Sequence, residues 1–195
     1  MRTLSALLVL MVLAGCQGGK PDSAAPGVVS NKDSTLNFSG SNLRGQSFVR
    51  KDLSNADFTN ADLSRANLAE TNLEGADFSG ALLAGVRSGA ISGTPRVLPQ
   101  GWRLVNGYLV GPGANLRHAV LTYARLDGMN LDEVDFTAAN LLYASFRGSS
   151  LVRTTIVGAK MFSSDMDGSV SRDLQGIPET LPRGWKLKDG EFSRR

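Results

Sequence analysis

Few residues in this chain have side chains suited to chemistry. One histidine, His118, and one cysteine, Cys16, are present among 195 residues, too few for a zinc site or an internal disulfide. A hydrolytic triad would need His118 as its base, but no serine near it lies in the pattern of a nucleophile elbow. Gly111-Pro112-Gly113 lacks the Lys-Ser/Thr pair that a phosphate-binding loop requires. We therefore expect no enzymatic activity, no metal and no cofactor.

The aspartates suggest a second chemistry, because paired carboxylates act as general acids or bind calcium. Asp52, Asp57 and Asp62 recur every five residues, a spacing that places neighbours on different faces of the fold. The nonapeptide pattern of calcium-binding repeats is absent. Asn and Asp favour turns because their side chains bond to nearby backbone groups, so the spacing indicates a turn-forming role.

A five-residue period runs through most of the chain. The ten middle positions from Phe38 to Leu83 are all Leu or Phe, and eleven of the twelve from Leu116 to Ser171 are Leu, Phe, Ile or Met. Five residues advance an α-helix by about 500°, so these side chains would not share a helix face. On a β-strand an odd spacing alternates between the two faces. A chain that turns a corner every five residues points all of them inward, which predicts a coil with four short sides.

The residues around each middle position complete the pattern. Ala often lies two residues before it, where a narrow interior suits a methyl group, and Asn or Asp lies between. This Ala-Asn/Asp-Leu/Phe-x-x pattern resembles the pentapeptide-repeat family over residues 36–90 and 114–173. The resemblance implies an all-β fold, a right-handed quadrilateral β-helix whose four five-residue sides make one coil. Phe38, Phe58 and Phe78 are spaced by 20 residues, so they should stack in one column.

Two parts of the repeat depart from the pattern. Gln46 and Lys51 occupy inward positions that are usually Ala, so we expect the first coil to be loose at its N-terminal end. Toward the end of the second block the middle residues become Met161, Met166 and Ser171, so we expect that block to fray.

One phrase occurs twice, once after each block of repeats. The copies are LPQGWRLVNGYL at 98–109 and LPRGWKLKDGEF at 181–192, offset by 83 positions. Each contains an Asn-Gly or Asp-Gly pair between alternating apolar residues, which predicts a two-residue β-hairpin.

Each copy also contains one of the two tryptophans, Trp102 and Trp185. Trp is enriched at interaction hot spots, so both are candidate partner contacts. Alternatively, they pack as covers over an exposed edge of the coil. We favour covers because an open β-edge must be protected from pairing with other chains.

These signals divide the chain into six segments. Each repeat block makes about three coils, and a solenoid that short is marginal alone, so we expect the blocks to stack as one body with the first hairpin looping out between them. The segments are a signal peptide (1–15), a lipid-anchored tether (16–33), a first repeat block (34–93), a hairpin insertion (94–113), a second repeat block (114–173) and a C-terminal hairpin and tail (174–195).

The N-terminus carries an export signal. Arg2 precedes an apolar run from Leu4 to Leu13, which is too short to span a bilayer and fits a secretory signal peptide. Its end, LAGC, resembles the lipobox of bacterial lipoproteins, which implies that Cys16 becomes an acylated N-terminus. Acyl chains anchor a protein to membrane lipid, and the small polar residues that follow form a flexible tether. Gln17, which is not Asp, implies by resemblance to Gram-negative lipoproteins an outer-membrane location facing the periplasm.

We therefore expect an exported, non-enzymatic, membrane-tethered lipoprotein. Its rigid β-solenoid would present a protein-interaction surface to an unidentified protein of the cell envelope, and solenoid ends also allow copies of the chain to associate. The net charge of +3, without a basic run, predicts no nucleic-acid partner.

Two alternatives stay open. Some pentapeptide-repeat proteins mimic DNA and inhibit topoisomerases, which needs a long acidic rod in the cytoplasm. The first block here has five basic and six acidic residues, a net charge of −1, and the chain carries an export signal. The other alternative is a ligand-binding module that uses the two Trp hairpins.

Overall fold

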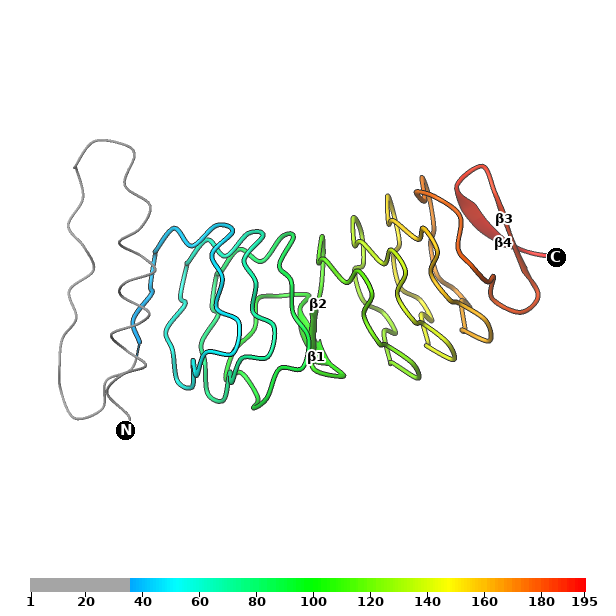
Figure 1. Cartoon of the computed structure of the whole chain (residues 1–195). Helices are drawn as coiled ribbons and strands as arrows, with labels where there is room; N and C mark the ends of the chain where they lie inside the picture. The colour runs from blue at the N-terminus through cyan, green and yellow to red at the C-terminus, as the bar shows by residue number, and fades with distance from the viewer. Residues whose placement is uncertain (1–35) are drawn as a thin grey trace.

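The computed structural model describes residues 36–195, which wind into one elongated stack of coils (Figure 1). The signal peptide, Cys16 and the tether lie outside the described residues. The described chain forms a right-handed β-helix and contains no α-helix, which confirms the all-β prediction. Within it, no helix is long and apolar enough to cross a bilayer.

Parallel β-bridges join residues that are 20 positions apart. Asn37 pairs with Asp57, and Asp57 pairs with Asp77 in the next coil. The backbone N–H of Phe38 donates to the carbonyl of Asp57 (2.8 Å), and the N–H of Asp57 donates to the carbonyl of Leu36 (2.9 Å). Each five-residue side contributes one such bridge, so four sides make a coil, as the period predicts.

Each corner is a four-residue turn that begins at an inward Leu or Phe. The N–H of Ala56 donates to the carbonyl of Leu53 (3.0 Å), and Asn55, the third residue of this turn, has a φ of 56°. Asn tolerates positive φ better than most residues, because its side chain bonds locally. The aspartate before the inward residue also serves the turn, since the N–H of Thr59 donates to Oδ1 of Asp57 (2.8 Å).

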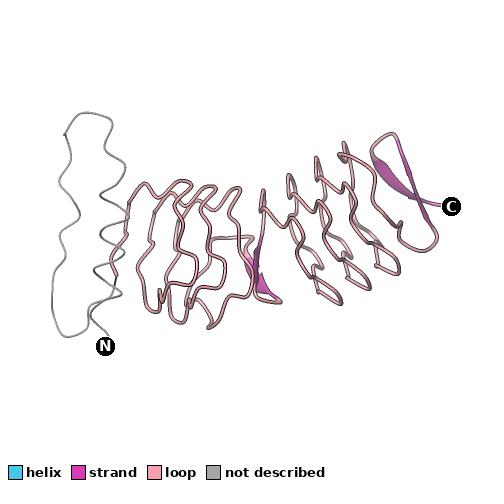
Figure 2. Ribbon diagram, in the orientation of Figure 1, coloured by secondary structure: helices cyan, strands magenta, loops and turns pink. Residues whose placement is uncertain are grey.

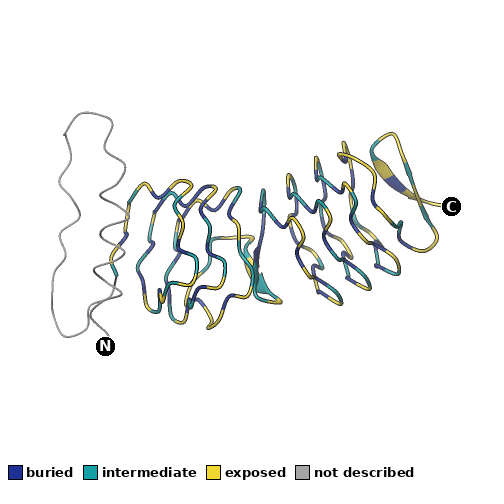
Figure 3. Cartoon of the chain, viewed as in Figure 1, coloured by how far each residue is buried: buried dark blue, intermediate teal, exposed yellow. Residues whose placement is uncertain are grey.

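Inward side chains form the core. Phe38, Phe58 and Phe78 stack with ring centroids 5.1 and 4.9 Å apart, so the predicted column is present. Buried inward residues alternate with exposed corners along both blocks (Figure 3). Gln46 and Lys51 are only half-buried, whereas the alanines of later coils are buried, in keeping with a looser first coil.

Within residues 36–195, strands of three or more residues occur only in the two hairpins (Figure 2). The first pairs β1 (Arg103–Val105) with β2 (Tyr108–Val110), and the second pairs β3 (Trp185–Lys188) with β4 (Glu191–Arg194). Both pairs are antiparallel, as predicted for a two-residue loop.

The first hairpin does not loop out as expected. One side of the solenoid runs past it without a break, because Arg87 pairs with Asn115 across the insertion. On the opposite side the hairpin fills the gap: its residues Leu109 and Val110 are fully buried. Leu109 belongs to the core of the first block and Val110 to the core of the second. The hairpin is therefore a layer of the stack.

Backbone and side-chain hydrogen bonds hold this layer on both sides. The N–H of Ile91 donates to the carbonyl of Gly107 (3.1 Å) on the side of the first block. On the side of the second block, the N–H of Val120 donates to the hydroxyl of Tyr108 (3.1 Å), and Nδ2 of Asn106 donates to the carbonyl of Thr122 (3.3 Å).

The prediction that the second block frays is wrong. Met161 and Met166 are fully buried and Ser171 is 8% exposed. The Ser171 hydroxyl accepts a hydrogen bond from the N–H of Phe192 in β4 (2.9 Å). Ser88, the equivalent residue 83 positions earlier, accepts the N–H of Leu109 in the same way (2.9 Å). A serine at this position supplies the acceptor that a hairpin strand needs where it meets the coil.

Candidate interaction surfaces

The residues with potential chemistry occupy structural positions. His118 is exposed and is the third residue of a corner turn, with a φ of 59°, a conformation in which His is enriched. Within residues 36–195 no group of three or more His, Cys, Asp or Glu side chains is arranged to hold a metal ion. The aspartates serve the turns and a set of ion pairs.

The ion pairs follow the repeat. An arginine directly after one inward residue pairs with the aspartate directly before an inward residue of the next coil, 18 positions on. The pairs of this kind are Arg44–Asp62 at 2.9 Å, Arg117–Asp135 at 3.2 Å and Arg147–Asp165 at 2.9 Å. Arg50 pairs with Glu70 along a neighbouring corner (2.8 Å). These pairs neutralise much of the carboxylate charge on the described surface.

Hydrogen bonds also stabilise the carboxylate form of these aspartates. Bonds from Ser64, and then the guanidinium of Arg44, lower the pKa of Asp62 to about 2. Bonds from Ser79 lower the pKa of Asp77 in the same way. Because Asp62 binds its proton more weakly when the chain is folded, it stabilises the fold above its ordinary pKa of 3.8.

We expect this stabilisation to disappear as the pH falls through about 2, so the free energy of unfolding should decline between pH 4 and pH 2. In Asp62→Asn the free energy of unfolding should fall less over this pH range. Asn still accepts the turn hydrogen bond, as Asn42 does, but it has no carboxylate to protonate. Urea unfolding of both proteins across this pH range measures the difference. Identical acid profiles would contradict this role of Asp62.

Trp102 lies at the junction of the two blocks. Its side chain is half-buried and packs against the cores of both. Gly111 passes directly beneath the indole, where an added Cβ would overlap the ring. Trp185 is also half-buried but contacts only the core of the second block. The guanidinium of Arg194, which occupies the position equivalent to Gly111, lies 5.3 Å from the centre of its ring.

The two hairpins dock on the coil before them through equivalent hydrogen bonds but present different outer faces. The N–H of Ile91 donates to the carbonyl of Gly107 (3.1 Å), and the N–H of Leu174 donates to the carbonyl of Gly190 (3.0 Å). On the face away from the first block, the first hairpin carries Val105, Tyr108 and Val110, whereas the second carries Lys188, Glu191 and Ser193 at the equivalent positions. The apolar face is covered by the second block. The polar face ends the stack, as terminal repeats of solenoids commonly do.

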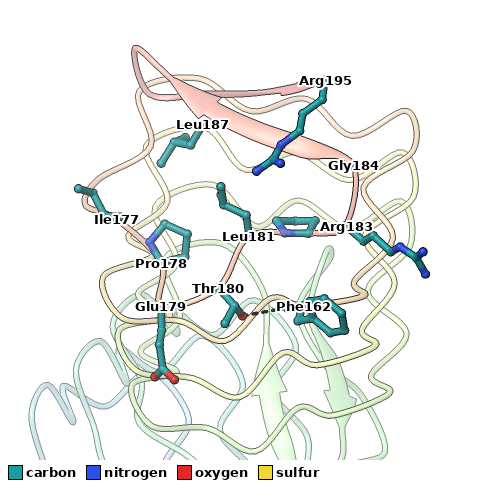
Figure 4. Close-up of a pocket in the computed structure, with 11 residues that line it drawn as sticks. Phe162, Ile177, Pro178, Glu179, Thr180, Leu181, Arg183, Gly184, Leu187 and Arg195 are labelled. Carbon is teal, nitrogen blue, oxygen red and sulfur yellow. Dashed lines mark hydrogen bonds between the residues drawn. The ribbon is translucent and has the colours of Figure 1, made fainter.

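A groove of about 580 Å³ lies at this C-terminal end (Figure 4). Its apolar lining includes Phe162, Ile177 and Leu181, and two arginines, Arg183 and Arg195, also line it.

Comparison with known proteins identifies the repeats. The family model for pentapeptide repeats matches in eight copies, over residues 37–75, 61–87, 112–137 and 130–168, which together cover more than half of the chain. The chain belongs to the pentapeptide-repeat family. A comparison with curated protein sequences finds no significant match.

Solved pentapeptide-repeat structures are similar to the chain at low identity. HetL, a protein from the cyanobacterium Nostoc that is involved in the regulation of heterocyst differentiation, is 20% identical, with a TM-score of 0.36, over 72% of this chain and 87% of HetL. Full-length QnrB1, a plasmid-mediated fluoroquinolone resistance protein, is 18% identical, with a TM-score of 0.31, over 69% of this chain and 72% of QnrB1. Similarity at this level carries no argument about function.

One surface feature stands out from the pentapeptide-repeat pattern. Tyr123 and Tyr143 occupy the third position of successive corner turns, and both have a φ of 59°. Their rings stack with centroids 5.0 Å apart, yet the residues are 69% and 48% exposed. Outward positions of the repeat are not constrained by the core, so the sequence pattern gave no reason to select them. Their 20-residue spacing is the signal that places them side by side.

Proposed function

We propose that this pentapeptide-repeat protein is a non-enzymatic scaffold, tethered to a membrane by an acylated Cys16, that presents a protein-interaction surface in the cell envelope. The observation that carries the scaffold role is the continuous stack, in which a hairpin layer joins two repeat blocks through their cores. Such a body holds outward residues at fixed spacing. Among the described residues, every buried side-chain nitrogen or oxygen has a hydrogen-bond partner. These buried polar groups therefore stabilise the fold through hydrogen bonds.

The tether and the envelope location are supported by the sequence before the solenoid. The apolar run and the lipobox-like LAGC favour export and acylation, and the small polar composition of residues 17–33 is typical of a tether. Two or more acyl chains hold a protein stably on a membrane. An outer-membrane location facing the periplasm, with Gln17 after the cysteine, is part of the proposal for a Gram-negative source.

The alternative of DNA mimicry has little support. A DNA duplex carries about one negative charge per 1.7 Å of axis. On the described surface Asp62, Asp135 and Asp165 pair with arginines, and the whole chain has a net charge of +3. A ligand site built on the tryptophans is also disfavoured, because Trp102 and Trp185 pack against the core.

Cys16→Ser tests the tether. In a bacterial host that processes lipoproteins, the wild-type chain should incorporate labelled fatty acid and fractionate with membranes. The variant should lose both the label and the membrane association, because serine cannot form the thioether to lipid. A wild-type chain that is unlabelled and remains in the cytoplasm would refute the proposal. Circular dichroism of both purified proteins controls for folding.

A further inference from the structure

The exposed tyrosines belong to a longer stripe that reaches the C-terminal groove. The N–H of Tyr143 donates to the carbonyl of Phe162 in the next coil (3.3 Å), so Phe162 continues the corner on which the tyrosines stack. Phe162 is 49% exposed and lines the groove together with Ile177, which is 78% exposed. Figure 4 shows Phe162, Leu181 and Arg183 around this groove. We call Tyr123, Tyr143 and Phe162 the aromatic stripe; Ile177 lies on the neighbouring corner, where the N–H of Gly158 donates to its carbonyl (2.8 Å).

The duplication of the chain supplies an internal comparison. The residues 83 positions earlier are Gly40, Asn60, Ser79 and Thr94, which are small or polar. Gly40 and Asn60 share the positive φ of the tyrosines, at 64° and 57°. The same backbone therefore folds without aromatic residues in the first block.

The tyrosines also carry a conformational cost. A positive φ costs an L-residue other than Gly roughly 1 kcal/mol, and a bulky residue there is uncommon. Gly, the residue type that avoids this cost, occupies the same turn position at Gly128, Gly148 and Gly158 of the second block. Other corner residues, such as His118 and Glu133, share this positive φ, so the backbone alone does not distinguish the tyrosines. Their exposure and their difference from the first block do, and both concern the same two side chains.

The charged side chains around the groove indicate what kind of partner it would bind. Glu179 pairs with Lys160 (3.7 Å), so its charge is compensated. Arg183 and Arg195 have no carboxylate partner among the described residues, although Nε of Arg195 donates to the carbonyl of Trp185 (3.1 Å). The groove therefore favours carboxylates beside apolar side chains.

The ring geometry favours a protein over a glycan. Sugars stack on the open faces of aromatic rings, but the two faces by which Tyr123 and Tyr143 meet are closed to such stacking, with planes only 10° apart. Their exposed edges and hydroxyl groups suit protein contacts, where Tyr and Arg are enriched. Coils are about 4.8 Å apart, so the distance from Tyr123 to Arg183 is roughly three steps or 14 Å, the length of about four residues of extended chain.

We propose that the aromatic stripe and the groove, with Arg183 and Arg195, form one docking surface for an extended, apolar and acidic segment of a partner protein. This inference rests on the proposed scaffold function and specifies where its partner binds. It does not require membrane attachment, so its failure would leave the Cys16 result unaffected, and the reverse also holds.

The test uses the purified full chain in detergent and a displayed library of random dodecapeptides. Peptides selected on the wild type should combine apolar residues with Asp or Glu. The variant Tyr123→Gly/Tyr143→Asn/Phe162→Ser replaces the three aromatic residues with those found 83 positions earlier in the first block. It should bind the selected peptides at least about tenfold more weakly, the loss expected for a hot-spot cluster, while its melting temperature stays equal or rises.

Two further variants sharpen the result. Arg183→Gln, which introduces the residue of position 100 in the first copy, should weaken binding and reduce its salt dependence. His118→Asn changes an exposed turn residue at a different corner and should leave binding unchanged.

Four outcomes would overturn the proposal. They are a selection that yields no peptide above background, full binding by the triple variant, selected peptides without acidic residues, and binding of N-acetylglucosamine oligomers to this surface in place of the peptides. If the triple variant does not fold, the single variants Arg183→Gln and Tyr143→Asn replace it. Each should then weaken peptide binding by at least about tenfold, and full binding by both would overturn the proposal.

Discussion

Trp102→Ala should destabilise the solenoid by about 3 kcal/mol, the lower end of the range for removing a large aromatic side chain, because Trp102 is half-buried. The indole packs against the cores of both blocks and lies on Gly111, so its loss opens a cavity at the junction. In a solenoid each layer contacts only its neighbours, so a weakened junction also reduces the cooperativity between blocks. The wild type should unfold in one transition and the variant in two.

Trp185 provides both the probe and the control. In Trp102→Ala, the fluorescence of Trp185 follows the second block alone, while circular dichroism follows both blocks, so urea transitions that differ between the probes reveal uncoupling. Trp185→Ala should cost less, because this ring contacts one core at the end of the stack. Equal costs for the two variants, with coincident transitions, would show that the hairpin plays the same part at both places.

The junction shows how much of the fold the sequence could predict. The period of five requires corners and an inward column, and the structure has both, because burial of Leu and Phe dominates the local choice. The expectation that the first hairpin loops out was wrong, because this hairpin packs on both sides, whereas an antiparallel sheet commonly has one apolar face. In this hairpin Leu104 packs on the first block, while Val105 and Tyr108 pack on the second. The second hairpin, with Lys188 and Glu191 at those positions, is the ordinary case.

Other features depended on contacts between distant residues. Ser171 looks like a weak point of the repeat, but its hydroxyl binds a backbone N–H 21 residues away in β4. Ser88 has the same role before the first hairpin, so the pair becomes visible once the two 83-residue units are aligned. The tyrosine stack required both the 20-residue register and the comparison between the blocks. In each case the repeat gives the position of a residue, and the function of its side chain depends on what the next layer places against it.

Phe58→Ala should have the largest effect within a block, about 3–5 kcal/mol. Phe58 is fully buried and stacks between Phe38 and Phe78, at 5.1 and 4.9 Å, with Phe48 edge-on at 6.1 Å. Truncation therefore removes three aromatic contacts, each worth about 0.5–1.5 kcal/mol beyond the buried area. Denaturant unfolding measures the total cost. Native-state hydrogen exchange should show faster exchange in the first block, while amides of the second block remain protected, because coupling between layers is local.

Phe136→Ala is the matched control. Phe136 is equally buried, but its only aromatic contact within the described chain is edge-on to Phe146, at 6.2 Å. Its cost should be lower than that of Phe58→Ala by about 1 kcal/mol or more, if stacking adds to burial. Equal costs would mean that buried area alone accounts for the column, and that Phe at positions 38, 58 and 78 is interchangeable with Leu. If Phe58→Ala instead exposes amides of both blocks equally, the hairpin layer transmits the loss from one block to the other, which would contradict local coupling between layers.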